Sequence, residues 1–184
     1  MELLDIVDEN GIPTGETVER ETAHCNGIRH RTSHVWLLRD RNGKIQVLLQ
    51  KRSLNKDSYP GCYDISSAGH IPAGEEFSGS AIRELKEELG VCVTEKELIY
   101  CGQRRFKCRG MFHGREFFDN QVSNVYALWK DLEEAEFMLQ KSEVDSVRWL
   151  DWQDCLDLVE NGKAPNCIWL KELEMVANAV NIPD

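Results

Sequence analysis

The sequence predicts an α/β (α+β) fold in which a mixed β-sheet is sandwiched between helices, and three observations support this expectation. β-rich runs precede and follow a central segment, residues 78–89, that has the periodicity of a helix. Two further helical segments, residues 152–161 and 166–180, end the sequence. Strands on both sides of one central helix, followed by helices, are typical of a sheet that is covered on both faces.

The N-terminal half supplies the first strands. Residues 3–7 form an apolar run that ends at the turn-forming residues 8–13. Two β-rich runs follow, residues 30–40 and 44–51. The segment Asp40-Arg41-Asn42-Gly43 joins them, and it predicts a hairpin because tight hairpin turns favour an Asn-Gly pair.

The remaining elements follow the same patterns. Gly90 stands directly after the central helix, where a helix end favours a left-handed residue. Residues 108–120 are polar, and we expect them to form an irregular loop. Further strands are predicted at residues 63–69, 98–107, 121–129 and 144–150.

The length of 184 residues leaves room for one domain with terminal additions. We predict a single domain over residues 1–184, with an N-terminal strand and extension at residues 1–29 and a core at residues 30–151. The C-terminal helices, residues 152–184, carry apolar faces that can cover the sheet. One of these helices could equally form a dimer contact, so a homodimer stays open.

The composition narrows the class of partner. A net charge of −10 argues against nonspecific nucleic-acid binding, which depends on neutralising many phosphates. No run approaches the roughly 18 consecutive apolar residues of a membrane span, and the acidic N-terminus lacks the basic start of a secretory signal. Seven scattered cysteines fit reduced thiols better than a disulfide framework or a zinc site. We therefore expect a cytoplasmic protein with no nucleic-acid or membrane partner.

Three glutamates lie on one face of the predicted central helix. At about 100° per residue, Glu84, Glu87 and Glu88 point the same way, while Leu85 and Leu89 lie on a second face that can pack against the sheet. Neighbouring carboxylates repel one another, so a helix gains no stability from grouping them. A hard divalent cation such as Mg²⁺ or Mn²⁺ removes that repulsion and binds carboxylates together with substrate phosphates. The pattern indicates a Mg²⁺ (or Mn²⁺) site, with a solvated acidic helix face as the alternative.

The surrounding segment makes the metal site the favoured interpretation. Residues 69–91 fit the pattern G-x5-E-x7-R-E-U-x-E-E-x-G-U, in which U is a bulky aliphatic residue. This pattern is the Nudix signature, so the chain resembles a Nudix hydrolase, and its strand order resembles that family's α/β/α sandwich. The matching positions are Gly69, Glu75, Arg83, Glu84, Leu85, Glu87, Glu88, Gly90 and Val91.

The resemblance implies a role for each of these positions. Glu84, Glu87 and Glu88 would be metal ligands in the catalytic centre, and Gly69 would add its backbone carbonyl. Arg83 would orient a glutamate by a charge-assisted hydrogen bond. The implied activity is metal-dependent hydrolysis of a diphosphate (phosphoanhydride) linkage in a small nucleoside diphosphate-type substrate.

Outside the signature, residues 3–130 resemble the branch that includes type 1 isopentenyl diphosphate isomerase. The similarity lies in the region of His24 and His30 and in residues 48–64. The isomerase needs a cysteine before the Gly-His pair and a glutamate acid on a later strand, whereas this sequence has Ala68 and Gln121. Alanine and glutamine cannot exchange protons with a double bond. Hydrolysis is therefore expected, with isomerase-like activity or a non-catalytic nucleotide-sensing module as alternatives.

Histidines mark a second point of resemblance. In the isomerase, the residues that match His24, His30 and His70 bind a second metal. Without the isomerase chemistry we interpret these three as ordinary hydrogen-bonding residues, which leaves a ligand role and the number of metal ions open. His34 is interpreted as structural.

Charged side chains provide the candidates for substrate binding and for the catalytic base. Cations are concentrated in residues 104–115, where Arg104 and Arg105 could bind the phosphate that does not sit on the metal, or simply form a solvated strand end. Lys51 and Arg52 end a predicted strand that approaches the diphosphate in the related branch. The base is either Glu87 or Glu88 or, in the predicted loop, Glu116 or Asp119. Four phenylalanines are interpreted as core residues, with stacking on a base as the alternative: Phe106, Phe112, Phe117 and Phe118. The tryptophans, Trp169 included, are interpreted as structural.

Overall fold

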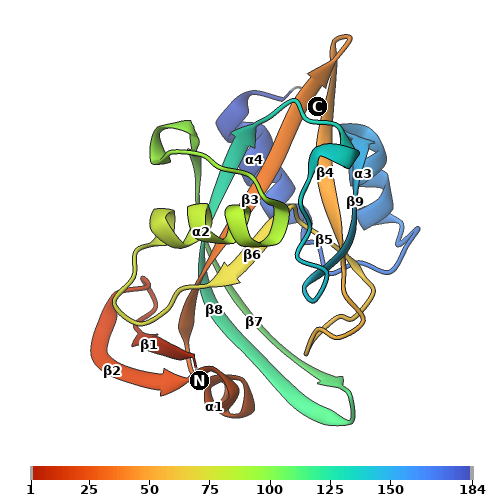
Figure 1. Cartoon of the computed structure of the whole chain (residues 1–184). Helices are drawn as coiled ribbons and strands as arrows, with labels where there is room; N and C mark the ends of the chain where they lie inside the picture. The colour runs from red at the N-terminus through yellow and green to blue at the C-terminus, as the bar shows by residue number, and fades with distance from the viewer. Residues whose placement is uncertain (1, 183–184) are drawn as a thin grey trace.

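A computed structural model describes residues 2–182 of the chain. Figure 1 shows helices packed on both faces of a sheet, with a long two-stranded ribbon projecting beyond it. The strands are β1 (Leu3–Val7), β2 (Pro13–Glu19), β3 (His30–Arg41), β4 (Lys44–Arg52), β5 (Tyr63–Asp64), β6 (Ser67–His70), β7 (Ile99–Phe112), β8 (Arg115–Trp129) and β9 (Val144–Asp151). The α-helices are α1 (Arg20–Asn26), α2 (Phe77–Leu89), α3 (Trp152–Glu160) and α4 (Leu170–Val180), and two short 3-10 helices are η1 (Glu95–Glu97) and η2 (Glu134–Glu136).

The main sheet is mixed. Its strands follow the order β5-β4-β3-β8-β7, with β6 also beside β3 and β9 also beside β4. β3 and β8 run parallel, with His30 opposite Gln121 and Leu38 opposite Trp129, and the other pairs are antiparallel. β1 and β2 form a separate two-stranded sheet. α2 covers one face of the main sheet while α3 and α4 cover the other, which confirms the predicted fold class (Figure 1).

Alternation along β3 divides the core between the two faces. Val35 and Leu37 belong to the cluster that includes Leu85 of α2, whereas Trp36 and Leu38 belong to the cluster that includes Leu173 of α4. Consecutive strand residues point to opposite faces, so one buried strand supplies side chains to both cores. No helix among residues 2–182 has the length and apolar content needed to cross a bilayer.

The predicted irregular loop at residues 108–120 is wrong. β7 and β8 continue as a paired ribbon through this segment, with Cys108 opposite Asp119 and Phe112 opposite Arg115. The turn is made by His113 and Gly114, both at positive φ (50° and 75°), as a type I′ hairpin turn requires. Residues 106–112 of β7 do alternate between half-buried and exposed positions, but residues 115–120 of β8 do not, so the sequence lacks the pair of matching alternating runs that predicts a hairpin.

Two further elements differ from the sequence expectations. β2 and α1 were not predicted, because β2 is almost entirely exposed and α1 has only seven residues. β2 is held by its pairing with β1 rather than by burial of its own side chains. The last helix begins at Leu170 instead of residue 166, since Tyr63 pairs with Asn166 in a parallel bridge just before it.

Candidate active site

A cavity of about 390 Å³ opens beside α2 and is lined by residues from both ends of the chain. Eight carboxylates and five cationic side chains line it, so the acidic side chains are in excess and favour a bound cation. The carboxylates are Glu2, Asp64, Glu84, Glu87, Glu88, Asp119, Glu143 and Glu172, and the cations are Arg20, Arg52, Lys56, Arg83 and Arg104.

Helix α2 presents all three predicted glutamates, Glu84, Glu87 and Glu88, to this cavity. An adjacent face of the helix buries Leu85 and Leu89 completely in the core, which fixes the rotation of the helix about its axis. The helix ends at Gly90, as predicted, where a φ of 72° lets the backbone N–H bond to carbonyls of the last turn.

The glutamates differ in their surroundings. Glu88 is 3% exposed, and within residues 2–182 its hydrogen-bond donors are neutral, Ser67 Oγ at 2.8 Å and Gln50 Nε2 at 3.4 Å. Burial raises the pKa of Glu88 to about 7. Burial also raises the pKa of Glu84, an effect that Arg83 opposes. The Glu87 side chain is about half exposed, at 52%.

Arg83 lies between two of the glutamates. Its Nη1 is 2.8 Å from Glu84 Oε1 and 3.1 Å from Glu87 Oε2, and its Nη2 donates to the carbonyl oxygen of His70 at 3.2 Å. One guanidinium therefore holds two carboxylates and anchors both to β6.

Gly69 of β6 packs directly against Glu84. A Cβ atom added at Gly69 would lie 2.1 Å from Cδ and 2.3 Å from Oε1 of Glu84, a distance that a real Cβ essentially never shows. Any larger residue would displace the carboxylate from the cavity wall. The glycine of the sequence motif is thus explained by the close approach of the glutamate.

This donor set fits a divalent cation. Glu84 and Glu88 place hard oxygen donors in the cavity, and both carboxylates are more costly to ionise than usual because they are buried. A cation bound between them would supply the positive charge that Ser67 and Gln50 do not.

Three histidines form a second group of potential ligands. Ring nitrogens of His24, His30 and His70 all lie within 4.8 Å of one another, and His24 Nε2 is 3.0 Å from His70 Nε2. Burial lowers the pKa of His24 to about 3 and lowers those of His30 and His70, so all three rings are neutral near pH 7. Three neutral imidazoles whose ring nitrogens lie this close together are a suitable ligand set for a metal ion.

Asp119 of β8 lines the cavity next to the histidines. Its Oδ1 is 3.9 Å from His30 Nε2, and neither atom has a hydrogen-bond partner among the described residues. Its other oxygen accepts from Gln121 Nε2 at 2.7 Å. Burial raises the pKa of Asp119 to about 6.

Arg104 of β7 is held by a buried carboxylate of α4. Arg104 Nε lies 2.8 Å from Glu172 Oε1, an ion pair in which the N–H is not aligned with the oxygen. Glu172 also meets His34 Nδ1 at 2.8 Å and Trp36 Nε1 at 3.1 Å. No acceptor among residues 2–182 is bonded to the terminal nitrogens of Arg104, which lines the cavity although it is 6% exposed.

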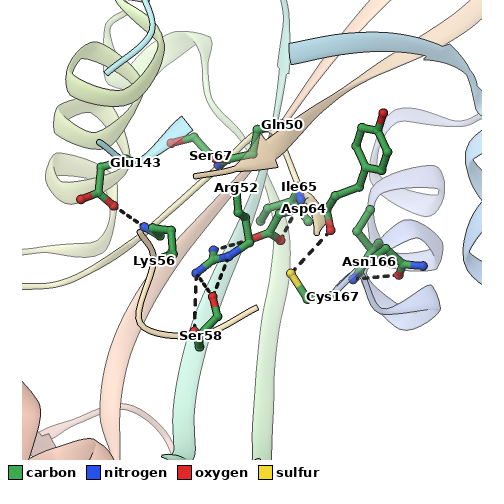
Figure 2. A network of polar contacts seen from close by, with 12 residues as sticks. Gln50, Arg52, Lys56, Ser58, Asp64, Ile65, Ser67, Glu143, Asn166 and Cys167 are labelled. Atoms are coloured by element: carbon green, nitrogen blue, oxygen red, sulfur yellow. Dashed lines mark hydrogen bonds and ion pairs between the residues drawn. The ribbon is translucent and has the colours of Figure 1, made fainter. Parts of the chain in front are cut away.

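Arg52 of β4 reaches the cavity but is already neutralised. Its Nη1 is 2.8 Å from Asp64 Oδ2, and its Nε and Nη2 donate to the carbonyl oxygen of Ser58 at 3.1 and 2.9 Å. Figure 2 shows this arrangement, with Lys56 and Glu143 paired nearby. Arg52 therefore shapes the cavity wall and has little capacity left for a further anion.

Three other predicted residues do not line the cavity. Lys51 and Arg105 alternate with neighbours that do, Arg52 and Arg104, so their side chains project from the other face of the strand. Arg105 Nη2 instead donates to Asn10 Oδ1 at 2.9 Å. Glu116 lies near the tip of the β7–β8 ribbon, where it pairs with Arg109 at 2.5 Å on the surface.

Four residues that the sequence reasoning treated as structural or core line the cavity, namely His34, Phe106, Phe117 and Trp169. Trp169 stands just before α4 and is 45% exposed. His34, also interpreted as structural, bonds to Glu172, which had no assigned role. The signal for Glu172 was present, because it lies four residues before the buried Val176 and therefore on the apolar face of its helix. A carboxylate on that face must have buried partners.

Comparisons with known proteins agree with this geometry. The family model described as NUDIX domain matches residues 28–170. Nudix hydrolase 3 of Arabidopsis thaliana is 37% identical over 157 residues, which are 83% of this chain and only 20% of that protein. A Nudix hydrolase of Listeria monocytogenes is 31% identical over 182 residues, 99% of each chain. The crystal structure of DR0079 from Deinococcus radiodurans shares the fold, with a TM-score of 0.68 at 20% identity over 97% of this chain and 99% of that one.

The family model spans most of the chain, and the Listeria relative is matched over almost its whole length. The residues that the family model matches include α2 with Glu84, Glu87 and Glu88, which face the cavity. The chain therefore belongs to the Nudix hydrolase family and is a pyrophosphohydrolase.

Proposed function

We propose that this enzyme hydrolyses a diphosphate linkage in a small nucleoside diphosphate-type substrate and requires Mg²⁺ or Mn²⁺. One observation carries the proposal: Glu84, Glu87 and Glu88 line the same cavity as Arg104, whose terminal nitrogens have no partner among the described residues. Ligands for a hard cation and a donor for phosphate oxygens thus line the same open cavity.

Each signature residue has a part in this arrangement. Glu84, Glu87 and Glu88 hold the cation, with the carbonyl of Gly69 as a further ligand, and Arg83 keeps Glu84 and Glu87 in position. When bound, the cation neutralises charge on the phosphoryl oxygens and lowers the pKa of a coordinated water.

Arg104 binds the substrate phosphate that is not held by the cation. Glu172 occupies its Nε side, which leaves the planar pair of Nη atoms to donate to phosphate oxygens. Arg52 is a weaker choice because Asp64 and Ser58 already satisfy its guanidinium.

Asp119 is the better of the two later candidates for the base, since it lines the cavity and Glu116 does not. A carboxylate with a pKa of about 6 accepts a proton near neutral pH. In this role it takes a proton from the attacking water, the water oxygen bonds to one phosphorus, and the bridging P–O bond breaks to release a phosphorylated product. Glu87 and Glu88 are the alternative bases.

The relation to the isomerase branch is part of the proposal, but isomerisation is the weaker candidate function. Ala68 and Gln121 both line the cavity, and neither carries a group that exchanges protons with a double bond. Gln121 is bonded to Asp119 and to Thr32 Oγ1, at 2.7 Å in each case. The histidine cluster is the part of that branch that this chain keeps, and it is the proposed place for a second ion.

A panel of diphosphates tests the proposed function. With Mg²⁺ or Mn²⁺, we expect some member of the panel to release a phosphorylated product, and Glu87→Gln to abolish this release. Glu95→Gln is a matched control, because Glu95 is exposed in η1 and lies outside the cavity. Tight binding without turnover under every divalent ion would favour a nucleotide-sensing module instead. Isotope-labelled water then identifies which phosphorus is attacked.

A further inference from the structure

An apolar groove of about 400 Å³ adjoins the cavity. The two spaces share three lining residues, Arg104, Phe106 and Trp169. Beyond these, the groove is lined by Val159, Ile168, Leu170, Arg105 and Lys171. A substrate whose phosphates lie in the cavity therefore has an apolar space, bordered by cations, next to its phosphate end.

Two aromatic rings form the boundary between cavity and groove. Phe106 of β7 and Trp169 pack with their ring centroids 4.6 Å apart at an interplanar angle of 57°. Trp169 remains 45% exposed in spite of this contact. A large aromatic ring that is supported by a neighbour and open to a ligand cavity is a ready surface for stacking.

Arg104 links these rings to the phosphate side of the cavity. Its guanidinium carbon lies 4.6 Å from the centroid of Phe106, while Glu172 holds its Nε. The same residue thus lies against the aromatic pair and offers donors to an anion. A ligand that is complementary to the aromatic pair and to the neighbouring guanidinium has an aromatic ring close to a diphosphate.

We propose that Trp169 and Phe106 form a subsite for the nucleobase of the substrate. This inference rests on the proposed hydrolysis of a nucleoside diphosphate-type substrate, and it names the side chains that would select such a substrate over an alkyl diphosphate. The base stacks on the exposed indole of Trp169, and Arg104 binds the phosphate next to it. A base needs a flat partner, which aromatic rings supply irrespective of base identity.

Binding of uncleavable analogues tests the subsite without turnover. The probes are α,β-methylene-ADP, methylenediphosphonate, which has no base, and a branched alkyl ester of methylenediphosphonate. We expect Trp169→Ala to weaken binding of the nucleotide analogue about 10-fold, and Trp169→Phe to weaken it less than about 3-fold. Binding of methylenediphosphonate stays unchanged in both variants. Trp129→Ala is the control, because Trp129 is similarly exposed, at 40%, and lies outside the cavity and the groove.

Two results would overturn the subsite. One is unchanged affinity of Trp169→Ala for the nucleotide analogue. The other is an equal loss for the alkyl ester, which would show a general apolar contact instead of base stacking. If the diphosphate panel is turned over while Trp169→Ala binds normally, the subsite is wrong and the hydrolase function stands. If no diphosphate is turned over but the analogue still depends on Trp169, the hydrolase function fails and the base subsite stands.

Discussion

Glu88 of α2 and Glu172 of α4 are both buried carboxylates beside the same cavity, 3% and 1% exposed, yet their surroundings are opposite. The hydrogen-bond donors of Glu88 in the described part of the chain are the neutral Ser67 and Gln50, and burial raises the pKa of Glu88 to about 7. Burial also acts on Glu172, but His34 and Arg104 outweigh it and lower the pKa of that carboxyl.

The difference separates a carboxylate that needs a ligand from one that is already satisfied. Glu172 is neutralised by side chains of the chain itself and so serves to position Arg104. No cationic side chain among the described residues donates a hydrogen bond to Glu88, and a divalent ion would supply positive charge there. In the proposed site, α2 would form the cation-binding wall, and Glu172 of α4 would position Arg104 of β7 in the phosphate-binding wall.

The largest expected effect is on turnover. Glu88→Gln removes an ionised ligand from the cation site while keeping the hydrogen-bonding shape, so we expect kcat to fall by about 10²–10³-fold. Steady-state kinetics on a substrate found in the panel measures this fall. Glu172→Gln should instead act mainly on KM, through Arg104. A greater loss of kcat in Glu172→Gln than in Glu88→Gln would contradict the assignment of Glu88 to cation binding and of Glu172 to the positioning of Arg104.

The second effect is on stability, where we expect substitution of Glu172 to cost more than substitution of Glu88. Glu172→Ala leaves Arg104 and His34 buried without their common partner, and we expect a loss of about 3–5 kcal/mol in the free energy of unfolding. Urea unfolding of the metal-free protein measures it. Glu88→Gln removes a carboxylate that is costly to ionise and should be neutral or stabilising near pH 8. Equal destabilisation by the two variants would contradict the comparison.

A third effect concerns pH. The pKa of Glu88 is about 7 in the folded protein and 4.5 as its ordinary value, so the folded state binds this proton more tightly. The associated stability is present near pH 4.5 and is lost as the pH rises to about 7, by up to about 3 kcal/mol. Without divalent ions, the unfolding free energies of wild type and Glu88→Gln should therefore diverge over this range. Parallel pH profiles would show that Glu88 is not the group responsible.

The smallest effect comes from the exposed carboxylate of β8. Glu116 pairs with Arg109 on the surface, so Glu116→Gln should change stability by less than about 0.5 kcal/mol and leave turnover unchanged. Asp119→Asn, three residues further along the same strand, should lower kcat because Asp119 lines the cavity. Thermal unfolding and kinetics on the two variants make this comparison. A loss of activity in Glu116→Gln but not in Asp119→Asn would favour Glu116 over Asp119 as the base.

The part of the site formed by α2 could be predicted from the sequence, because it depends on the spacing of residues within a single helix. The spacing of Glu84, Glu87 and Glu88 fixes their common face through helix geometry alone, and Leu85 fixes which face is buried. The hairpin at Asn42-Gly43 is local in the same sense, since both residues adopt the positive φ that the turn needs, 56° and 76°.

The part of the site that involves α4 could not be predicted in the same way. Glu172 meets His34 and Trp36 across more than 130 positions of sequence, and nothing in the pattern of one helix identifies such distant partners. Asp119 was predicted to lie in an irregular loop, because residues 115–120 of β8 do not alternate between buried and exposed positions. It was still named as a candidate base. Long-range pairing of strands, rather than local propensity, puts this carboxylate in the cavity.

Calorimetric titration of the metal-free protein with Mg²⁺ tests the central claim most directly, using wild type, Glu88→Gln and Glu172→Gln. The account predicts that wild type binds Mg²⁺, that Glu88→Gln binds it at least about tenfold more weakly, and that Glu172→Gln retains wild-type affinity. Equal affinity in wild type and Glu88→Gln would contradict a cation site on α2.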